Sequence, residues 1–134
     1  VTNYGCNSVG NILQHGVILE KATLTFNGIG HIIKGAKGAD AQQESRVLML
    51  SDQARSDANP ILLIDENDVT AGHAASIGQV DPEDMYYLMS RGLDQATAER
   101  LVVRGFLGSV IVEIPVKEVR EEMIQTIEDK LLKR

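Results

Sequence analysis

The sequence predicts a protein that is mainly β with a smaller α-helical part, because two hydrophobic patterns follow one another along the chain. Up to about Val80, glycine, β-branched residues and short apolar runs bounded by turn-forming residues are typical of strands and turns. After Val80, apolar residues recur with the 3.6-residue period of an α-helix. We therefore expect two domains, a β core over residues 1–80 and a C-terminal helical module over residues 81–134.

Four strands are expected in the β-rich part. Residues 22–26 alternate apolar side chains with threonines, which is the pattern of a strand with one buried face, and residues 27–28 are predicted to turn the chain. Further strands are expected at residues 29–34, 45–51 and 61–65. The last two are apolar on both faces, so either the protein's own helices or a partner subunit must cover the second face. The sequence alone leaves both possibilities open.

Three helices are expected in the second part. Asp81 as N-cap and Pro82 as the first helical residue mark the start of one, and Gly92 is placed to end it. A second helix is capped by Asp94 and is apolar almost all round, which is typical of a central helix. A third begins near Pro115 and is amphipathic, so we expect it on a surface.

Composition excludes several classes of function. The net charge of −6 disfavours binding to nucleic acid or to an anionic membrane, and no apolar run approaches the roughly 20 residues needed to span a bilayer. The single cysteine, Cys6, cannot form an internal disulfide, which favours a reducing compartment, by default the cytoplasm. Val1 opens the chain without an initiator methionine, so we expect an excised part of a longer protein.

Several short motifs have a structural explanation. The glycines of residues 28–38 match neither the order of a dinucleotide-binding loop nor that of a phosphate-binding loop. Residues 65–68 lack the glycine and glutamate of a calcium loop and are interpreted as a polar turn between strands. Arg91 is assigned a structural role at the end of the first helix. No serine or cysteine is paired with a base by spacing, so nucleophilic catalysis has no support.

The three histidines differ in their settings. His15 and His31 are expected on strand or turn surfaces. His73 lies among small residues, which leaves its imidazole unshielded, as suits a metal ligand. A histidine that hydrogen-bonds locally at a strand end is the structural alternative.

Four longer segments together resemble the C-terminal part of the SufB/SufD family, whose members are subunits of an iron–sulfur cluster assembly scaffold. They are residues 35–51 (GAKGADAQQESRVLMLS), 59–65 (NPILLID), 68–78 (DVTAGHAASIG) and 86–93 (YYLMSRGL). A composite of several long motifs is far more specific than any three-residue signature.

The resemblance implies the end of a right-handed parallel β-helix followed by a small C-terminal helical module. It also implies a non-enzymatic scaffold subunit of the SufBCD complex, pairing with a SufB-like paralogue and docking a SufC-like ATPase through the helices. Residues 45–51 and 61–65 are the candidates for the pairing surface. A homodimer of the isolated chain stays open, and unpaired strand edges would be enough to produce it as an artefact.

The resemblance also assigns His73 as a metal ligand, working with a cysteine of SufB across the subunit interface. Residues 53–57 carry no thiol where a SufB chain is expected to supply one, which favours the SufD branch of the family. No cofactor is then bound stably by this chain, and an iron–sulfur cluster passes transiently through the interface.

Two alternatives stay open at this point. One is a generic β-solenoid that binds a different protein and whose histidine is structural. The other is a metal-dependent enzyme in which His15, His31 and His73 converge on one ion, which requires imidazole nitrogens within about 5 Å of one another.

Overall fold

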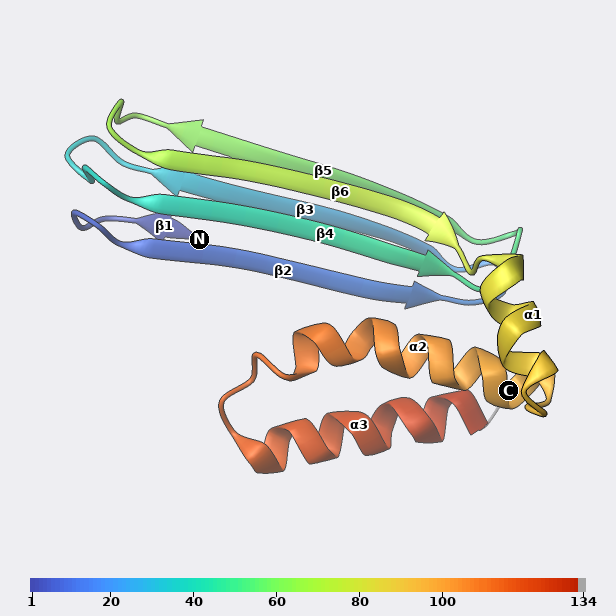
Figure 1. The fold of residues 1–134 in the computed structure, drawn as a ribbon. Helices are drawn as coiled ribbons and strands as arrows, with labels where there is room; N and C mark the ends of the chain where they lie inside the picture. The colour runs from blue at the N-terminus through green and yellow to red at the C-terminus, as the bar shows by residue number, and fades with distance from the viewer. Residues whose placement is uncertain (133–134) are drawn as a thin grey trace. The chain divides into compact units, whose positions relative to one another are not determined.

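The computed structural model describes residues 1–132. The chain divides into two compact units, residues 1–78 and residues 79–134, which are described separately. The first unit contains the strands and the second contains three helices (Figure 1). The predicted class, mainly β with helices, is confirmed.

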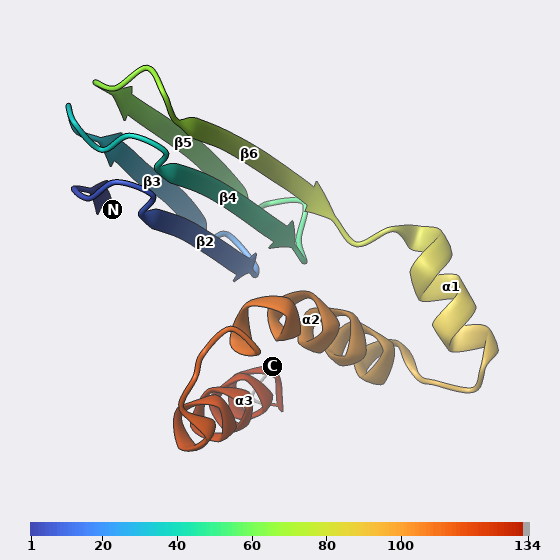
Figure 2. The same cartoon turned by 60° about the vertical axis from the view of Figure 1, so that its left-hand side comes forward.

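Within residues 1–132, six strands alternate between two parallel sheets, with the order β1-β3-β5 in one and β2-β4-β6 in the other. Figure 2 shows the two sheets as two layers. The strands are β1 (Thr2–Asn3), β2 (Val9–Ile18), β3 (Thr23–Ile32), β4 (Asp40–Met49), β5 (Arg55–Ile64) and β6 (Thr70–Gln79).

Each return to the same sheet takes about the same length of chain. Val9 of β2 aligns with Asp40 of β4, 31 residues later, and Thr23 of β3 aligns with Arg55 of β5, 32 residues later. Parallel neighbours need a crossover connection, and here each crossover contains a strand of the other sheet. The chain therefore winds back and forth between two layers with a nearly constant step.

The predicted turn at residues 27–28 is wrong, because β3 runs unbroken through it. Asn27 aligns with Asn59 of β5, and the Asn59 side-chain amide donates a 3.0 Å hydrogen bond to Asn27 Oδ1. Gly28 is buried and faces Gln43, where a Cβ would lie 1.9 Å from Gln43 Nε2. Asn27 therefore suits the face of β3 on which its side chain bonds to Asn59, and Gly28 suits the opposite face, where the Gln43 side chain leaves no room for a Cβ.

The interior of the first unit is apolar at both ends and polar in the middle. One cluster contains Ile32, Ala36, Ala39 and Ala41, and the other contains Ile18, Val47 and Ala54. Between them the buried inner positions include Gln43 and Ser45, which are 3% and 1% exposed.

The two strand segments expected to be apolar on both faces, residues 45–51 and 61–65, differ in how far their apolar side chains are exposed. In β4, Val47 belongs to the buried core and is 3% exposed. In β5, Ile61 and Leu63 are 42% and 46% exposed, and Ile29, aligned with Ile61 on β3, is 48% exposed. The sheet that contains β5 therefore has a row of exposed apolar side chains; on the other sheet Val9 and Leu13 of β2 are exposed too, at 70% and 44%.

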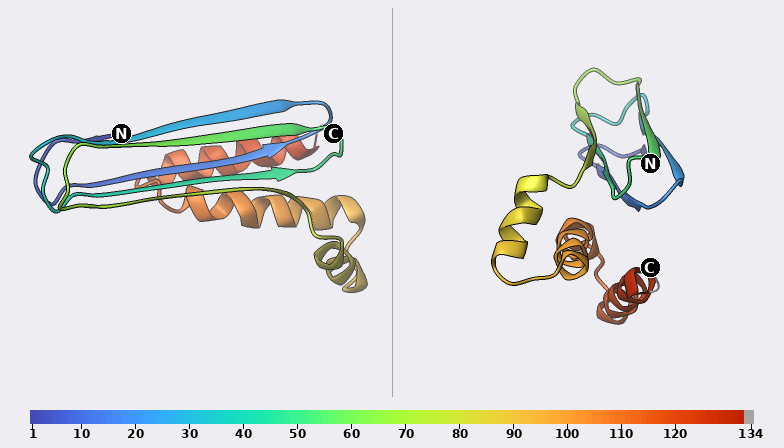
Figure 3. Two further views of the ribbon diagram at one scale, coloured as in Figure 1. Left: turned by 90° about the horizontal axis from the view of Figure 1, so that it is seen from above. Right: turned by 90° about the vertical axis from the view of Figure 1, so that its right-hand side faces the viewer.

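The second unit contains α1 (Pro82–Ser90), α2 (Gln95–Ile111) and α3 (Lys117–Leu132). The predicted caps are confirmed: the Asp81 side chain accepts from the Glu83 N–H at 2.8 Å, and the Asp94 side chain accepts from the Thr97 N–H at 2.7 Å. Figure 3 shows α2 and α3 side by side. Among the described residues, none of the helices has the length and apolar character required to cross a bilayer.

Candidate functional site

His73 lies in β6 and is exposed to solvent. Its chain neighbours are Gly72 and Ala74, so no adjacent bulky side chain screens the imidazole. The prediction that His73 is unshielded is therefore confirmed. An accessible neutral imidazole can act as a metal ligand, a proton acceptor or a hydrogen-bond donor.

The hydrogen bonds at the start of β6 define its register against β4. In the pair formed by β2 and β4, the Asp40 N–H donates to the Ser8 carbonyl at 2.9 Å and Asp40 aligns with Val9, the next residue. The Thr70 N–H donates to the Ala39 carbonyl at 2.9 Å in the same way. Thr70 therefore aligns with Asp40.

This register aligns His73 with Gln43 and Gly72 with Gln42. The glycine contact supports it independently, because a Cβ on Gly72 would lie 2.7 Å from Gln42 Oε1. Aligned residues of neighbouring strands share a face of the sheet, and Gln43 is buried on the inner face. His73 thus lies on the same face of the sheet as Gln43. It is exposed because β6 is an edge strand of that sheet.

The inner row beneath His73 is polar. The Ser45 hydroxyl donates to Gln14 Oε1 at 2.8 Å, joining β4 to β2. Both side-chain polar atoms of Gln43 are buried without a hydrogen-bond partner. Sequence reasoning missed Gln43, because nothing in its local pattern indicates which strand lies next to it.

The other two histidines are paired with carboxylates at separate places. His15 Nε2 lies 3.1 Å from Glu44 Oε1, and this contact is the largest cause that holds the pKa of Glu44 below its ordinary value. His31 Nε2 lies 2.9 Å from Asp65 Oδ2 in the other sheet. The expected surface position is confirmed for His31, whose side chain is 32% exposed, but is wrong for His15, at 3%. Within residues 1–132, no three His, Cys, Asp or Glu side chains gather as a metal site would require.

The polar turn at residues 65–68 contains an unexpected buried carboxylate. Glu66 is 6% exposed and accepts hydrogen bonds from the backbone N–H groups of Gly35, at 2.9 Å, and Asn67, at 3.0 Å. These bonds, that from Gly35 first, hold the pKa of Glu66 below its ordinary value. Glu66 therefore ties together two successive turns on the same side of the sheets.

Cys6 and Arg91 have local partners. Cys6 is exposed, and its thiol lies 3.4 Å from the Gly35 carbonyl. Arg91 is the C-cap of α1, with its guanidinium carbon 5.1 Å from the centre of the Tyr87 ring, and Gly92 follows with φ of +94°. This arrangement fits the structural role expected for Arg91.

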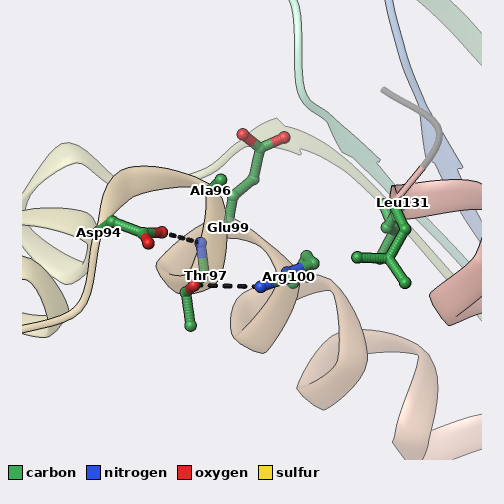
Figure 4. Close-up of a pocket in the computed structure, with 7 residues that line it drawn as sticks. Asp94, Ala96, Thr97, Glu99, Arg100 and Leu131 are labelled. Carbon is green, nitrogen blue, oxygen red and sulfur yellow. Dashed lines mark hydrogen bonds between the residues drawn. The ribbon is translucent and has the colours of Figure 1, made fainter.

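Described residues of the helical unit line two hollows. One, of about 390 Å³, lies at the start of α2, where the Asp94 side chain accepts from Thr97 and the Arg100 guanidinium donates to the Thr97 hydroxyl at 3.1 Å (Figure 4). The bond from the Thr97 N–H holds the pKa of Asp94 below its ordinary value. The other, of about 120 Å³, lies between α2 and α3 beside the Arg104–Glu128 ion pair.

Comparison with known proteins points to one family. The family described as "SUF system FeS cluster assembly, SufBD core domain" matches residues 1–106. The iron–sulfur cluster assembly protein SufD of Bacillus subtilis is 57% identical over 131 residues, which covers 98% of this chain and 30% of that protein.

Two relatives of lower identity are named as members of the SufBD family. An iron–sulfur cluster assembly SufBD family protein of Mycobacterium bovis, Mb1497, is 46% identical over 72% of this chain and 24% of its own length. A second, Mb1496, is 34% identical over 83% of this chain and 13% of its own. The chain thus spans less than a third of the length of each of these relatives. With the family match extending from the first strand into α2, this chain belongs to the SufBD family of iron–sulfur cluster assembly proteins.

Proposed function

We propose that this chain is the C-terminal part of a SufD-like scaffold subunit that acts without enzymatic activity of its own in iron–sulfur cluster assembly. Family membership and the 57% identity to a SufD protein support the assignment. The observation that carries it is the exposed imidazole of His73 on an outer strand. The single cysteine supports a reducing compartment, the cytoplasm.

His73 is proposed to contribute one ligand to a shared site, and a thiolate of a SufB-like paralogue another. Imidazole and thiolate are both competent ligands of iron, and iron or a forming cluster is here the cargo of the site. A site divided between two subunits forms only when they associate. This chain is therefore proposed to hold no cluster stably by itself.

The strands are proposed to be the last coils of a right-handed parallel β-helix. The alternation of two parallel sheets and the nearly constant steps of 31 and 32 residues support this architecture. The two compact units then correspond to the end of the β-helix and the helical module.

We propose that the SufB-like paralogue contacts the exposed apolar row of β3 and β5. Ile29 and Ile61 are aligned there and Leu63 continues the row on β5. Val47 and Leu48 of residues 45–51 are only 3% and 8% exposed, whereas Ile61 and Leu63 are 42% and 46% exposed, so the pairing surface is proposed chiefly on residues 61–65. The same row, together with unpaired strand edges, would drive self-association of the isolated chain.

The helical module is proposed to dock a SufC-like ATPase. The hollow between α2 and α3 has an apolar lining that includes Leu107, Ile111 and Ile124, and Arg104 and Glu128 lie at its side. An apolar recess with charged residues beside it resembles a protein-docking surface more than a site for chemistry.

The test is cluster assembly by the full-length SufD-like protein reconstituted with its SufB-like and SufC-like partners. His73→Ala should leave the fold intact and strongly reduce the yield of cluster, measured by absorbance and by bound iron and sulfide. Ser76→Ala is the matched control, because Ser76 is exposed on the same strand as His73 and lies outside the proposed pairing row of β3 and β5. Undiminished yield in His73→Ala would contradict the assignment.

A pull-down separates this proposal from a generic protein-binding solenoid. Retention of the SufC-like ATPase by the full-length protein supports the scaffold role. Failure to retain it, with the SufB-like partner present and folded, would favour the generic module.

A further inference from the structure

Gln43 is an unsatisfied polar side chain in the interior of the first unit. It is 3% exposed, and neither Oε1 nor Nε2 has a hydrogen-bond partner. A buried amide group left without a hydrogen bond destabilises the folded state, because its hydration is lost and not replaced. Such a residue in a folded protein calls for a partner that completes it.

Among the residues around Gln43, the side chain best placed to be its hydrogen-bond partner is on β6. Ile12, its aligned neighbour on β2, has no polar atom to offer. Gly28, across the interior, lacks a side chain altogether, and its empty space is filled by the Gln43 amide. On the remaining side the aligned residue is His73, by the register of Thr70 with Asp40.

The neighbouring polar pair, Gln14 and Ser45, is hydrogen-bonded within itself and makes no hydrogen bond to Gln43. Gln14 Oε1 accepts the hydrogen of Ser45 at 2.8 Å, and these two residues align with each other on β2 and β4. Gln43 is two residues before Ser45 on β4, so both side chains are on the same face of the strand. The Gln43 amide therefore has the hydrogen-bonded pair of Gln14 and Ser45 as one neighbour and His73 as another.

We propose that Gln43 is a positioning residue for His73. Its carboxamide oxygen accepts a hydrogen bond from one ring N–H of His73, and the other ring nitrogen keeps its lone pair for iron. Aligned residues on neighbouring strands are about 4.8 Å apart, so a side-chain rotation of the exposed histidine is enough to close this bond. The inference deepens the proposed function and rests on it for the role of the free nitrogen.

The expected consequence is a fixed tautomer and a fixed ring orientation. A ligating histidine commonly donates its second N–H to an oxygen, and loss of that oxygen typically costs 10- to 100-fold in metal affinity or activity. A glutamine suits this task because it is neutral and only one of its terminal atoms can accept. The buried amide and the exposed imidazole would thus act as one unit.

The test uses the full-length protein labelled with ¹⁵N-histidine, in which His73→Ala identifies the His73 signals. In the parent protein we expect one dominant tautomer of His73, and in Gln43→Leu a mixture of both. Gln42→Leu is the matched control, since Gln42 lies on the opposite face of the same strand, is exposed and pairs with Asp40. An unchanged tautomer ratio in a folded Gln43→Leu protein would overturn the proposal.

A second variant and the parent protein guard against a folding defect. Gln43→Met keeps the length of the side chain without an acceptor oxygen and should give the same mixture. If both variants unfold, a mixed tautomer of His73 in the parent protein would itself overturn the proposal. In the reconstituted complex, Gln43→Leu should slow cluster formation about tenfold. If His73→Ala leaves assembly unchanged, the proposed function fails, while the tautomer result still decides the contact between Gln43 and His73.

Discussion

Replacing Gly28 by alanine tests the arrangement of the interior directly. A Cβ at this position would lie 1.9 Å from Gln43 Nε2, 2.8 Å from Gln43 Cδ and 3.2 Å from Gln14 Oε1. Ordinary van der Waals contact begins near 3.4 Å, so the Gln43 amide would have to move by about 1.5 Å. Gln43 is almost fully buried, and little free space is available for that movement.

We expect Gly28→Ala to lower the free energy of unfolding by about 1–3 kcal/mol, the usual cost of adding a methyl group to a packed core. The clash involves mainly one side chain, so it should depend on that side chain. Gln43→Ala removes both of the shortest contacts and opens space for the new methyl group. The double variant should therefore lose less stability than the two single variants together, by at least about 1 kcal/mol.

The assay is urea unfolding of the full-length protein carrying each single change and the pair. Gly78→Ala is the control, because it lies in a strand like Gly28 and a Cβ there has no atom within 4 Å. This control should change stability little. If the two changes at Gly28 and Gln43 add within about 0.5 kcal/mol, the contact between them does not exist as described, and the reasoning that places Gln43 in the interior fails.

Three further predictions follow from the structure. Hydrogen bonding lowers the pKa of Glu66 in the folded state, so the ionised carboxylate stabilises the fold above about pH 4.3, the ordinary pKa of a glutamate, and this stabilisation is lost as the pH falls through the lower folded pKa. The difference in unfolding free energy between the parent protein and Glu66→Gln, measured by urea unfolding, should therefore shrink between about pH 5 and pH 3. A difference that stays constant over this range would contradict the prediction. Asp94→Ala should speed hydrogen exchange at the Thr97 amide, measured by NMR, because the capping bond is lost, and unchanged exchange would argue against the cap. Ile32→Val, at a fully buried position, should cost about 0.5–1.5 kcal/mol in urea unfolding, whereas Ile29→Val, 48% exposed on the same strand, should cost much less, and equal costs would contradict the assignment of faces.

The helical part could be predicted well from the sequence because its signals are local. Asp81 with Pro82, Asp94, and Gly92 act through bonds and backbone angles within a few residues of themselves. The structure places the helix ends where these residues predict them. A cap needs no information from distant parts of the chain.

The strands were harder to predict because their signals depend on neighbours about 31 residues away. Asn27 and Gly28 together are typical of a turn, yet both lie inside β3. Their local preference is overridden by the amide bond to Asn59 and by the space that Gln43 requires. Likewise β2 and β6 contain glycine and small residues that conceal their alternation.

In the candidate site, too, one residue could be predicted from the sequence and another could not. His73 could be selected from the sequence because small neighbours and the family resemblance both point to it. Gln43 could not, since its interest comes from the register of β6 on β4 and from the lack of any partner for its amide. The sequence pattern indicated that His73 is exposed, but only the fold indicates which residue can supply a hydrogen-bond partner to Gln43.

The position of His73 on an outer strand explains how one residue can be both aligned with the interior and open to solvent. On β4, the aligned position holds a glutamine that is 3% exposed, because β2 and the opposite sheet enclose it. On β6, no strand follows in the described sheet, so the same inward position is open. A strand or surface added beside β6 by a partner would change the exposure of His73 more than that of the enclosed Gln43. His73 therefore lies at an open edge of the sheet, where its exposure depends on whatever packs beside β6.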